Sequence, residues 1–340
     1  MISDIRKILK EPCENISSLT GVDEYSKRIG LLEHAVLLVQ SAIQRQDLTD
    51  ISLDNNVSKS QISKLDTGRP YQLFVEIFYE LVYPYIMAHN YAMYRRFLGI
   101  IGIDSTFIRT AIRESGIYKR KKTEEGIKVH QAAMVFPMGI PLESAVTPAN
   151  LNDSPEFEML LENIDPALVK GSILTFDLGY YDLDRFRKLK EDGIKFVTRI
   201  KRNARYEVLK TYAHSSIIRF RNNLVLRLVS MEIKGEKKDY ITDIMDIPDI
   251  YIHWIYSQRW NIEIFFRRMK SYLKIDHLIS KKINGILVQI FTSLIAYLIL
   301  MMIQGMLAYS LSIPEIIRNI RHGLPLMFRM PDDAIEPLTI

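Results

Sequence analysis

The sequence predicts an α/β fold, in which a core of alternating strands and helices follows an all-helical region. Two observations favour this class. Apolar runs rich in β-branched residues, such as residues 97–109 and 171–177, each contain an aspartate and alternate with helical segments. The first 95 residues instead carry apolar side chains at helical spacing. A chain of 340 residues with 48% hydrophobic content can form two or three compact subdomains, and this composition excludes a disordered chain.

The amino-terminal region, residues 1–95, is predicted to be helical. Apolar residues recur at helical spacing from Leu31 to Ile43, and residues 71–94 form a second apolar, aromatic-rich helical stretch. Residues 57–65 are a candidate recognition helix, because their polar side chains match those that reach base edges and phosphates in helix-turn-helix units. An ordinary capped surface helix explains the same residues equally well.

The first candidate functional residue is Asp104, inside the apolar run 97–109 that predicts a buried strand. Burying a lone carboxylate costs several kcal/mol, so this side chain must be paired or must bind a cation. A structural aspartate that accepts hydrogen bonds from local N–H groups is the alternative interpretation.

Asp177 repeats this pattern at the end of the apolar run 171–177, just before Gly179. Enzymes of the α/β class place catalytic groups after such strands, although an aspartate before a turn is also common for turn formation alone. The other core elements are expected as strands at 128–137 and 141–148, a helix at 155–164, a helix at 182–192 with Phe186 and Leu189 facing inward, and a strand at 195–201.

A third feature is the predicted helix from Tyr256 to Lys270. At about 100° of turn per residue, four functional side chains fall within roughly 60° of one face. These are Tyr256, Arg259, Glu263 and Lys270, while Ile262, Phe265, Met269 and Leu273 form an apolar opposite face. A carboxylate flanked by cations suggests phosphate chemistry, whereas a solvated amphipathic helix is the simpler alternative.

The segment before this helix has a different pattern. Short alternating runs bounded by Asn222-Asn223 and by 234–236 predict a β-rich insertion that separates Asp177 from Glu263 by 86 positions (263 minus 177). The expected domain organisation is a helical region at 1–95, the first part of the core at 96–204, the insertion at 205–248, the catalytic helix and a closing helix of the core at 249–312, and a tail at 313–340.

The carboxy-terminal part contains an uncharged run, residues 283–314, which is long enough to span a bilayer. Polar residues such as Asn284, Gln289 and Gln304 interrupt the run, so we expect a buried closing helix instead. The first residues include Asp4, Arg6 and Lys7 and do not resemble a signal peptide.

Three motifs together resemble the DDE transposases of prokaryotic insertion sequences, specifically the group with a Tyr-Arg-Glu-Lys (YREK) signature. The motifs are Gly-Ile-Asp-Ser-Thr around Asp104, Phe-Asp-Leu-Gly-Tyr around Asp177, and the helix around Glu263, which keeps the signature spacing. Further similar pieces are Lys128-Val129-His130, Pro148-Ala149-Asn150 with Asp153, and residues 196–201. The resemblance covers roughly residues 95 to 310 and implies an RNase H-like catalytic core.

The resemblance implies that Asp104, Asp177 and Glu263 are the catalytic residues and the metal ligands. Two-metal phosphoryl transfer needs carboxylates that converge on two divalent ions about 3.5–4 Å apart. Carboxylate ligands favour Mg²⁺, and Mn²⁺ is a plausible substitute. Zinc is not indicated, because the single Cys13 and the seven dispersed histidines show no zinc-site spacing.

DNA-binding candidates surround these acids. By resemblance, Tyr256, Arg259 and Lys270 contact the transposon end, with Arg259 suited to bidentate phosphate binding. Net charge is only +5, but positive residues cluster at 119–122, 199–205 and 267–274, where solvated faces are the alternative. The other candidates are Trp260, for which ordinary packing is the alternative, and Arg267, Lys128, His130, Arg199 and Lys201.

The sequence therefore predicts a cut-and-paste transposase that binds terminal inverted repeats and target DNA and performs metal-dependent cleavage and strand transfer. By resemblance, attack is in-line without a covalent protein–DNA intermediate, and excision through a hairpin is compatible with the family. A homodimer in the DNA complex and a cytoplasmic, nucleoid-associated location without membrane attachment are expected; the single cysteine suits a reducing compartment. The alternatives are an RNase H-like endonuclease, a silent domesticated DNA-binding protein and, more remotely, a membrane-anchored protein.

Overall fold

The computed structural model describes residues 2–24, 26, 29–90, 99–110, 119–121, 124–137, 139–151 and 153–328. Parts of the predicted segments 71–94 and 97–109, Lys122 of the first positive cluster and the end of the predicted tail lie outside these residues. The chain divides into two compact units. The helical unit comprises Met1–Met93, Ile108–Gly126 and Arg267–Ile340, and the sheet unit comprises Tyr94–Phe107 and Ile127–Phe266.

The sheet unit is built on five strands of the predicted core, and three of them form a parallel group. The strands are β1 (Gly99–Arg109), β3 (Glu124–Phe136), β4 (Ile140–Pro148), β5 (Ser172–Phe176) and β6 (Lys195–Arg199), in the spatial order β4, β3, β1, β5, β6. The short strand β2 (Lys119–Lys121) pairs with the beginning of β3. Because β1, β5 and β6 are parallel, their carboxyl ends point the same way. The mixed α/β class is confirmed.

The register of β1 and β5 places the two aspartates side by side. Ile103 pairs with Phe176, so Asp104 and Asp177 are the next residues along two adjacent parallel strands. Strand β1 also lies close to β3, because a Cβ atom on Gly102 would come within 2.7 Å of a Val135 methyl group. A side chain at Gly102 would push apart the strands that position Asp104.

Helices cover the core strands and fix the end of β5. They are α6 (Glu156–Glu162), α7 (Pro166–Gly171) and α8 (Leu183–Glu191), of which α7 was not predicted. Phe176, the last residue of β5, is buried and stacks on Phe186 and Phe196, and Phe157 meets it edge-on. Aromatic packing therefore holds the backbone immediately before Asp177.

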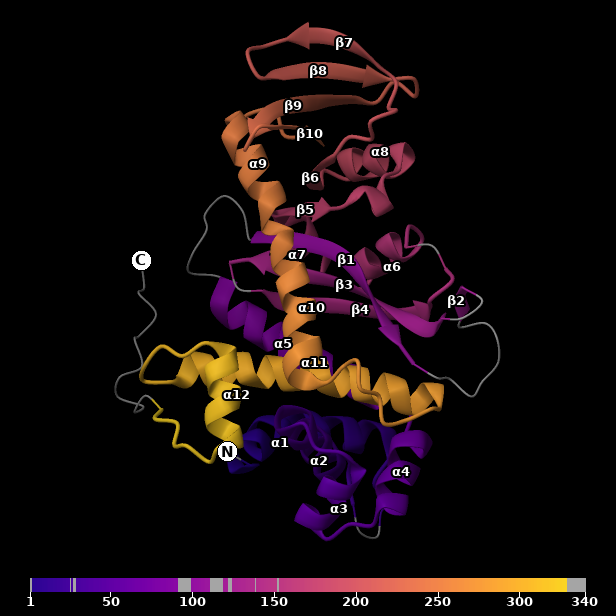
Figure 1. Ribbon diagram of the computed structural model, residues 1–340, viewed down its shortest axis with the longest axis vertical. Coiled ribbons are helices and arrows are strands. Elements are labelled where there is room, and N and C mark those ends of the chain that lie inside the picture. Colours follow the sequence, from indigo (N-terminus) through magenta and orange to yellow (C-terminus); the bar gives the residue numbers. More distant parts are fainter. Residues whose placement is uncertain are drawn as a thin grey trace. The chain divides into compact units, whose positions relative to one another are not determined.

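Residues 206–242 form four antiparallel strands that continue the same sheet beyond β6 (Figure 1). They are β7 (Tyr206–Thr211), β8 (Ser215–Phe220), β9 (Val225–Ile233) and β10 (Glu236–Thr242), with β10 paired to β6. Lys234 and Gly235 both have positive φ angles, 52° and 78°, as a two-residue hairpin turn requires.

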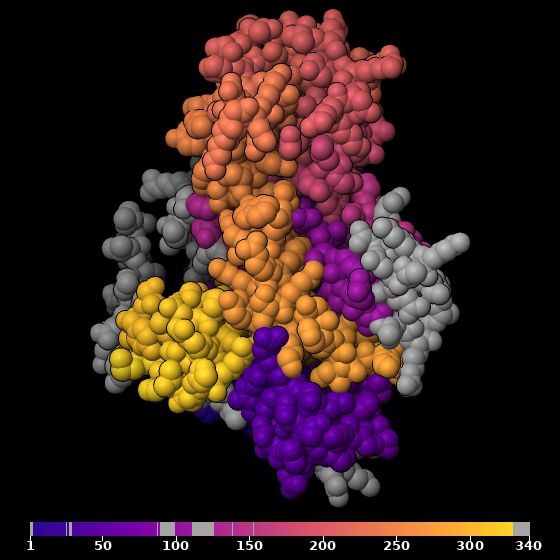
Figure 2. All heavy atoms as spheres, in the orientation of Figure 1, coloured from indigo at the N-terminus to yellow at the C-terminus, as the bar shows by residue number. Residues whose placement is uncertain are grey.

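The predicted helix from Tyr256 to Lys270 is divided between α9 (Asp249–Gln258) and α10 (Trp260–Leu273), which meet at Arg259. At this junction the Arg259 N–H donates to the Tyr256 carbonyl and the Ile262 N–H donates to the Arg259 carbonyl, so the turn is tighter than an α-helix. The predicted apolar face, Ile262, Phe265, Met269 and Leu273, is buried. Figure 2 shows α9 and the start of α10, in orange, on the surface of the sheet unit.

The helical unit contains the amino-terminal helices and the last helices of the chain. They are α1 (Ile2–Thr20), α2 (Leu31–Gln44), α3 (Leu48–Asn55), α4 (Lys59–Gly68), α5 (Gln72–Asn90), α11 (Ile283–Met306) and α12 (Ile313–Arg321). Helix α4 overlaps the candidate recognition helix, and the Ser58 hydroxyl caps it by accepting from the Gln61 N–H. Lys59, Ser63 and Lys64 are exposed, whereas Ile62 is buried.

Helix α11 forms the centre of the helical unit. Among the residues that the structure describes, it is the one helix long and apolar enough to cross a membrane, and 83% of its most apolar window is buried inside the protein. It packs against α2, α4, α5 and α12. This helix was predicted to close the catalytic core, whereas in the structure it belongs to the same unit as the amino-terminal helices. Its surface is apolar all round and therefore needs cover from several helices.

We expect Leu298→Ala in α11 to lower the free energy of unfolding by about 2–5 kcal/mol, because it removes a fully buried side chain from the helical unit and leaves a cavity. Leu19→Ala, in α1 of the same unit, is the matched control, since Leu19 is largely exposed and its loss should change stability by no more than about 0.5 kcal/mol. Urea denaturation followed by circular dichroism measures both. Equal effects would show that α11 is not the packed core of this unit.

Candidate functional site

The three predicted acids come from three elements of the sheet unit. Asp104 lies on β1, Asp177 directly follows β5, and Glu263 is in the first turn of α10. The Asp177 carboxylate accepts a hydrogen bond from the Gly179 N–H at 2.8 Å, and Asp104 accepts one from the Ser105 N–H at 2.8 Å. The helix dipole at the start of α10 favours a negative charge at Glu263. The two aspartates are thus oriented by their own local backbone.

Arg259 joins two of these acids. One terminal nitrogen donates to Asp104 Oδ2 at 2.9 Å, and the other donates to Glu263 Oε1 at 2.7 Å. The Arg259 side chain is 15% exposed and that of Asp104 is 17% exposed, so the pair is well shielded from solvent. A guanidinium that bridges two carboxylates in this way neutralises part of their charge and holds β1 and α10 in register.

Asp104 is the electrostatically strained member of the site. The pKa of its carboxyl group is raised to about 6, because burial and the nearby charges of Asp177 and Glu263 together outweigh the lowering by Arg259 and the Ser105 N–H. Asp177 and Glu263 therefore both lie within electrostatic range of Asp104. They are therefore a single cluster of negative charge, not three independent surface groups.

Tyr256 borders this cluster, and Arg199 lies within electrostatic range of Tyr256. Burial raises the pKa of Tyr256, while the positive charges of Arg259 and Arg199 lower it. The Arg259 guanidinium lies 5.8 Å from the centre of the Tyr256 ring. The Tyr240 ring also packs against Tyr256, with the two ring centres 5.1 Å apart. The structure thus brings together Tyr256, Arg259 and Glu263 of the predicted signature.

The position of Lys270 relative to Glu263 follows from the turns of α10. Lys270 lies seven positions, about two turns, after Glu263 and is half-buried, and burial lowers its pKa. Arg267 is exposed, and both residues belong to the helical unit. Trp260 is 52% exposed, so ordinary core packing does not explain it.

Lys128 and His130 form a separate group with Asp153. The Lys128 ammonium donates to Asp153 Oδ1 at 2.8 Å, and His130 Nε2 shares a 2.8 Å hydrogen bond with the Thr147 hydroxyl. His130 is 0% exposed, and burial lowers its pKa to about 4, so the ring is neutral near pH 7. The prediction that His130 contacts DNA needs correction, because a fully buried neutral imidazole presents no surface or charge to a phosphate.

The other predicted basic contacts are at the surface of the sheet unit. Lys201 lies over the Tyr181 ring, with its ammonium 4.7 Å from the ring centre. Its neighbours Arg202 and Arg205 are exposed or partly exposed. The positive segment 119–122 has no described side chains, so that prediction lies outside the described residues.

Tyr180 lies near the site although it was not among the predicted site residues. Tyr180 is buried, and burial together with the charges of Asp153, Asp104 and Asp177 raises the pKa of its hydroxyl group. Its carbonyl accepts a hydrogen bond from Arg185, which also forms an ion pair with Glu158. The signal was present in the Phe-Asp-Leu-Gly-Tyr motif, but a tyrosine after a turn gives no indication by itself that it lies within electrostatic range of Asp153, Asp104 and Asp177.

The donor chemistry of the cluster suits a hard divalent cation, because all three acids offer oxygen ligands. The arrangement of these side chains in the described residues does not suit such a cation. Within the described residues, no three or more histidine, cysteine, aspartate or glutamate side chains are placed together so that they could hold a metal ion. Arg259 instead occupies the space between Asp104 and Glu263. In this conformation an internal cation takes the position that a metal ion would need.

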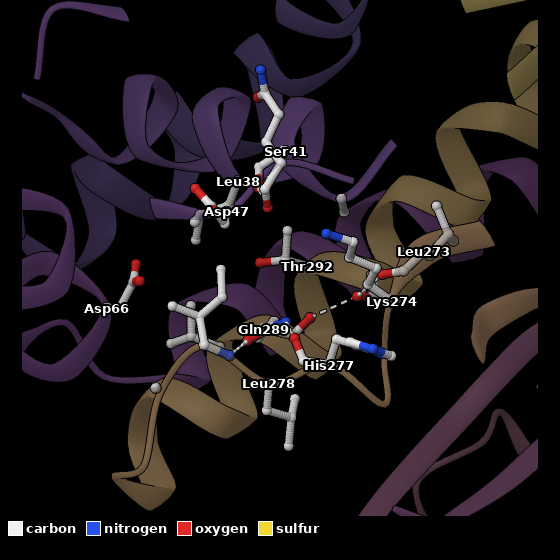
Figure 3. A pocket seen from close by; sticks show the side chains of 16 residues that line it. Leu38, Ser41, Asp47, Asp66, Leu273, Lys274, His277, Leu278, Gln289 and Thr292 are labelled. Carbon is white, nitrogen blue, oxygen red and sulfur yellow. Dashed lines mark hydrogen bonds between the residues drawn. The ribbon is translucent and has the colours of Figure 1, made fainter. Parts of the chain in front are cut away.

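A cavity lies in the helical unit, apart from the residues of the acid cluster (Figure 3). This cavity, of about 300 Å³, is lined by residues of α2, α4 and α11 and of the segment after α10, and none of the three acids lines it. Gln289 spans its wall, accepting from the Ile279 N–H at 2.8 Å and donating to the His277 carbonyl at 3.0 Å. These bonds tie the segment after α10 to α11, which is a structural task.

The fold resembles that of a known transposase. Over 95% of this chain and 77% of the other, it is similar to piggyBac transposase, solved as a synaptic complex with hairpin DNA, with a TM-score of 0.51 and 14% sequence identity. At this identity the likeness shows the fold alone.

Sequence comparison identifies the family. Residues 95–299 match the family described as Transposase DDE domain, and the chain belongs to that family. Its relatives include a protein described as a transposase for insertion sequence element IS4SA from Synechocystis sp., 34% identical over 143 residues, which are 38% of this chain and 41% of the relative. A transposase for element IS5377 from Geobacillus stearothermophilus is 25% identical over 191 residues, 52% of this chain and 48% of the relative.

The chain thus spans less than half the length of these curated relatives. The predicted membership among the DDE transposases is confirmed, and the YREK subgroup stays a prediction.

Asp104→Asn should stabilise the metal-free protein near pH 7.5 by about 1–3 kcal/mol, because it removes a charge whose burial the folded state disfavours. The folded-state pKa is raised, so the folded wild type binds the proton more tightly than the unfolded chain. The wild-type protein should therefore gain stability as the pH falls through about 6, and the advantage of the variant should shrink.

Urea denaturation in EDTA at two pH values measures this difference. Asp184→Asn, at an exposed position on α8, is the matched control and should change stability by no more than about 0.5 kcal/mol at either pH. A destabilised Asp104→Asn protein near pH 7.5 would show that Arg259 more than offsets the cost of burying the Asp104 charge.

Proposed function

We propose that this protein is a DDE transposase that binds the terminal inverted repeats of an insertion sequence and catalyses metal-dependent DNA cleavage and strand transfer in a cut-and-paste reaction. One observation carries the proposal: Asp104, Asp177 and Glu263, which lie far apart in the sequence, form one electrostatic cluster in a chain of the DDE transposase domain family. The RNase H-like arrangement of the core supports it, since both aspartates stand at the ends of adjacent parallel strands.

The three acids would hold two Mg²⁺ ions, or Mn²⁺ in their place, and such ions supply the activation of an attacking oxygen and the stabilisation of a leaving oxygen. The residues around them have distinct tasks. Arg259 can bind a DNA phosphate through two parallel hydrogen bonds, and Tyr256 can donate its hydroxyl hydrogen to a phosphate oxygen. Lys270 adds a positive charge further along α10. The Ser105 and Gly179 N–H groups keep the two aspartates oriented.

The DNA interface would extend from this cluster over the basic and aromatic surface of the sheet unit. Arg199 and Lys201 would provide positive charge, Lys128 would do so on releasing its ion pair with Asp153, and the exposed Trp260 would stack on an unpaired base. The exposed polar face of α4 and Arg267 would add contacts from the helical unit. We further propose a homodimer in the complex that joins two transposon ends, and a cytoplasmic, nucleoid-associated location.

The test uses purified protein and a plasmid that carries its gene with several hundred flanking base pairs. Mg²⁺-dependent breaks at the edges of an inverted repeat, absent in EDTA, would establish a transposase. Metal-dependent breaks scattered over the plasmid would instead indicate an endonuclease. Specific binding without any break would indicate a DNA-binding protein that lacks catalysis.

Glu263→Gln should retain DNA binding but lose at least about 100-fold in cleavage rate, because a neutral amide replaces a negatively charged metal ligand. Gel-shift titration and nicking assays on the same plasmid measure the two properties separately. Glu191→Gln, on the exposed side of α8, is the matched control and should cleave as the wild type does. Full activity of the Glu263 variant would exclude this residue from the metal site.

Lys201→Gln should weaken binding to all DNA sequences alike and reduce the slope of log K against log salt concentration by about 0.9, because one phosphate contact is lost. Lys170→Gln, at an exposed position on α7, should leave the slope unchanged. Fluorescence anisotropy at several salt concentrations gives both slopes. An unchanged slope for the Lys201 variant would remove this residue from the DNA interface.

A further inference from the structure

We propose that Arg259 is a latch that keeps the acid cluster closed to metal ions until DNA is bound. In this account, which rests on the proposed function, the guanidinium bridges Asp104 and Glu263 in the free protein. It leaves them for a DNA phosphate when the ions bind. The same side chain therefore couples metal loading to substrate binding.

The contacts of Arg259 support the closed state. Both terminal nitrogens are engaged with carboxylate oxygens, at 2.9 Å to Asp104 and 2.7 Å to Glu263. The bond to Asp104 joins residues 155 positions apart in the sequence. A metal ion and the arginine would thus use the same two carboxylates. An ion bound by both Asp104 and Glu263 would compete with the guanidinium that is now paired to both.

Electrostatics favour an exchange over coexistence. With Arg259 in place, three carboxylates face one permanent positive charge, so the cluster still attracts cations. Once divalent ions compensate the remaining negative charge, the guanidinium would lie a few ångströms from them. Like charges repel strongly in a shielded site. The bridge that stabilises the free protein would therefore become unfavourable in the loaded protein.

The surroundings give Arg259 a second position. Its Nε–H group is buried without a hydrogen-bond partner in the present conformation, so the side chain does not use all its donors on the acids. The Tyr256 ring, 5.8 Å from the guanidinium, offers an aromatic face beside it. A DNA phosphate at this face would accept two parallel hydrogen bonds from the side chain, in place of the single bonds that it now donates to Asp104 and to Glu263.

The consequence is reciprocal coupling. If DNA draws Arg259 away, the acids bind ions more tightly, and by thermodynamic linkage bound ions must increase the affinity for DNA to the same extent. A protein that loads its ions on the substrate in this way does not hold a complete cleavage centre when it is free.

The alternative is that Arg259 permanently positions the acids. The two roles predict opposite effects of its removal on metal binding in the absence of DNA. If Arg259 only orients Asp104 and Glu263, its loss disorders the ligands and weakens metal binding. If it is a latch, its loss frees the ligands and strengthens metal binding.

The experiment titrates the purified full chain with Mn²⁺ alone, without DNA, and follows free Mn²⁺ by electron paramagnetic resonance. Arg259→Gln should bind Mn²⁺ more tightly than the wild type by about fivefold or more. Arg187→Gln, which removes a half-exposed arginine of the sheet unit, is the matched control and should bind as the wild type does. The double variant Arg259→Gln with Asp104→Asn should lose the gain, which would assign the gain to the acid cluster.

Unchanged or weaker Mn²⁺ binding by Arg259→Gln would overturn the latch. Arg259→Lys provides a second test should the glutamine variant not fold, because a single ammonium cannot bridge two carboxylates as a guanidinium does. The lysine variant should also bind Mn²⁺ more tightly than the wild type, and wild-type affinity in it would count against the latch.

A titration of the wild type with its end DNA present separates this proposal from the proposed function. With DNA, the wild type should bind Mn²⁺ about fivefold or more tightly than without it. Equal Mn²⁺ affinity of the wild type with and without DNA would overturn the latch and leave the transposase proposal intact. No Mn²⁺ binding to the acid cluster under either condition would overturn both.

Discussion

Repulsion among three carboxylates is the constraint that the rest of the candidate site satisfies. Asp104, Asp177 and Glu263 lie close enough to raise the pKa of Asp104, and burial of Asp104 adds to the cost of its charge. A folded protein tolerates such a cluster only if positive charge and hydrogen-bond donors surround it. Arg259 supplies the charge, and the N–H groups of Ser105 and Gly179 supply the donors. The cluster is stable enough to form, yet it retains an attraction for cations.

The sheet unit is built to impose this proximity. Parallel pairing of β1 with β5 puts two aspartates next to each other, and the glycine at position 102 lets β1 approach β3 closely. The aromatic cluster around Phe176 fixes the end of β5. Glu263 then arrives from a helix that begins just after Arg259, so the third acid and its positive partner come from the same turn. Packing free energy elsewhere in the unit thereby offsets the electrostatic cost of the site.

Much of this arrangement could be predicted from the sequence, because burial and periodicity are local signals. Aspartates within or after apolar runs marked Asp104 and Asp177, and helical spacing placed Tyr256, Arg259 and Glu263 on one face. The features that were missed depend on tertiary contacts. The tight turn at Arg259, the burial of His130 and the position of Tyr180 beside three acids follow from how strands and helices meet, which spacing along the chain does not determine.

The uncharged helix α11 shows the same limit. Its composition predicted burial, but the sequence carried no sign of which helices would cover it, and they proved to be α2, α4 and α5 of the amino-terminal region together with α12. The bridge from Arg259 to two acids is a similar case. A signature of phosphate-binding residues indicated contact with DNA, and only the folded chain shows that the arginine has carboxylate partners.

The most direct test of the central claim is a crystal structure of the protein with its cleaved end DNA in Mn²⁺, recorded with anomalous scattering. The account predicts two anomalous peaks within about 2.0–2.6 Å of carboxylate oxygens of Asp104, Asp177 and Glu263, with the Arg259 guanidinium on a DNA phosphate. Peaks bound elsewhere, or no peaks while Arg259 still bridges Asp104 and Glu263, would contradict it.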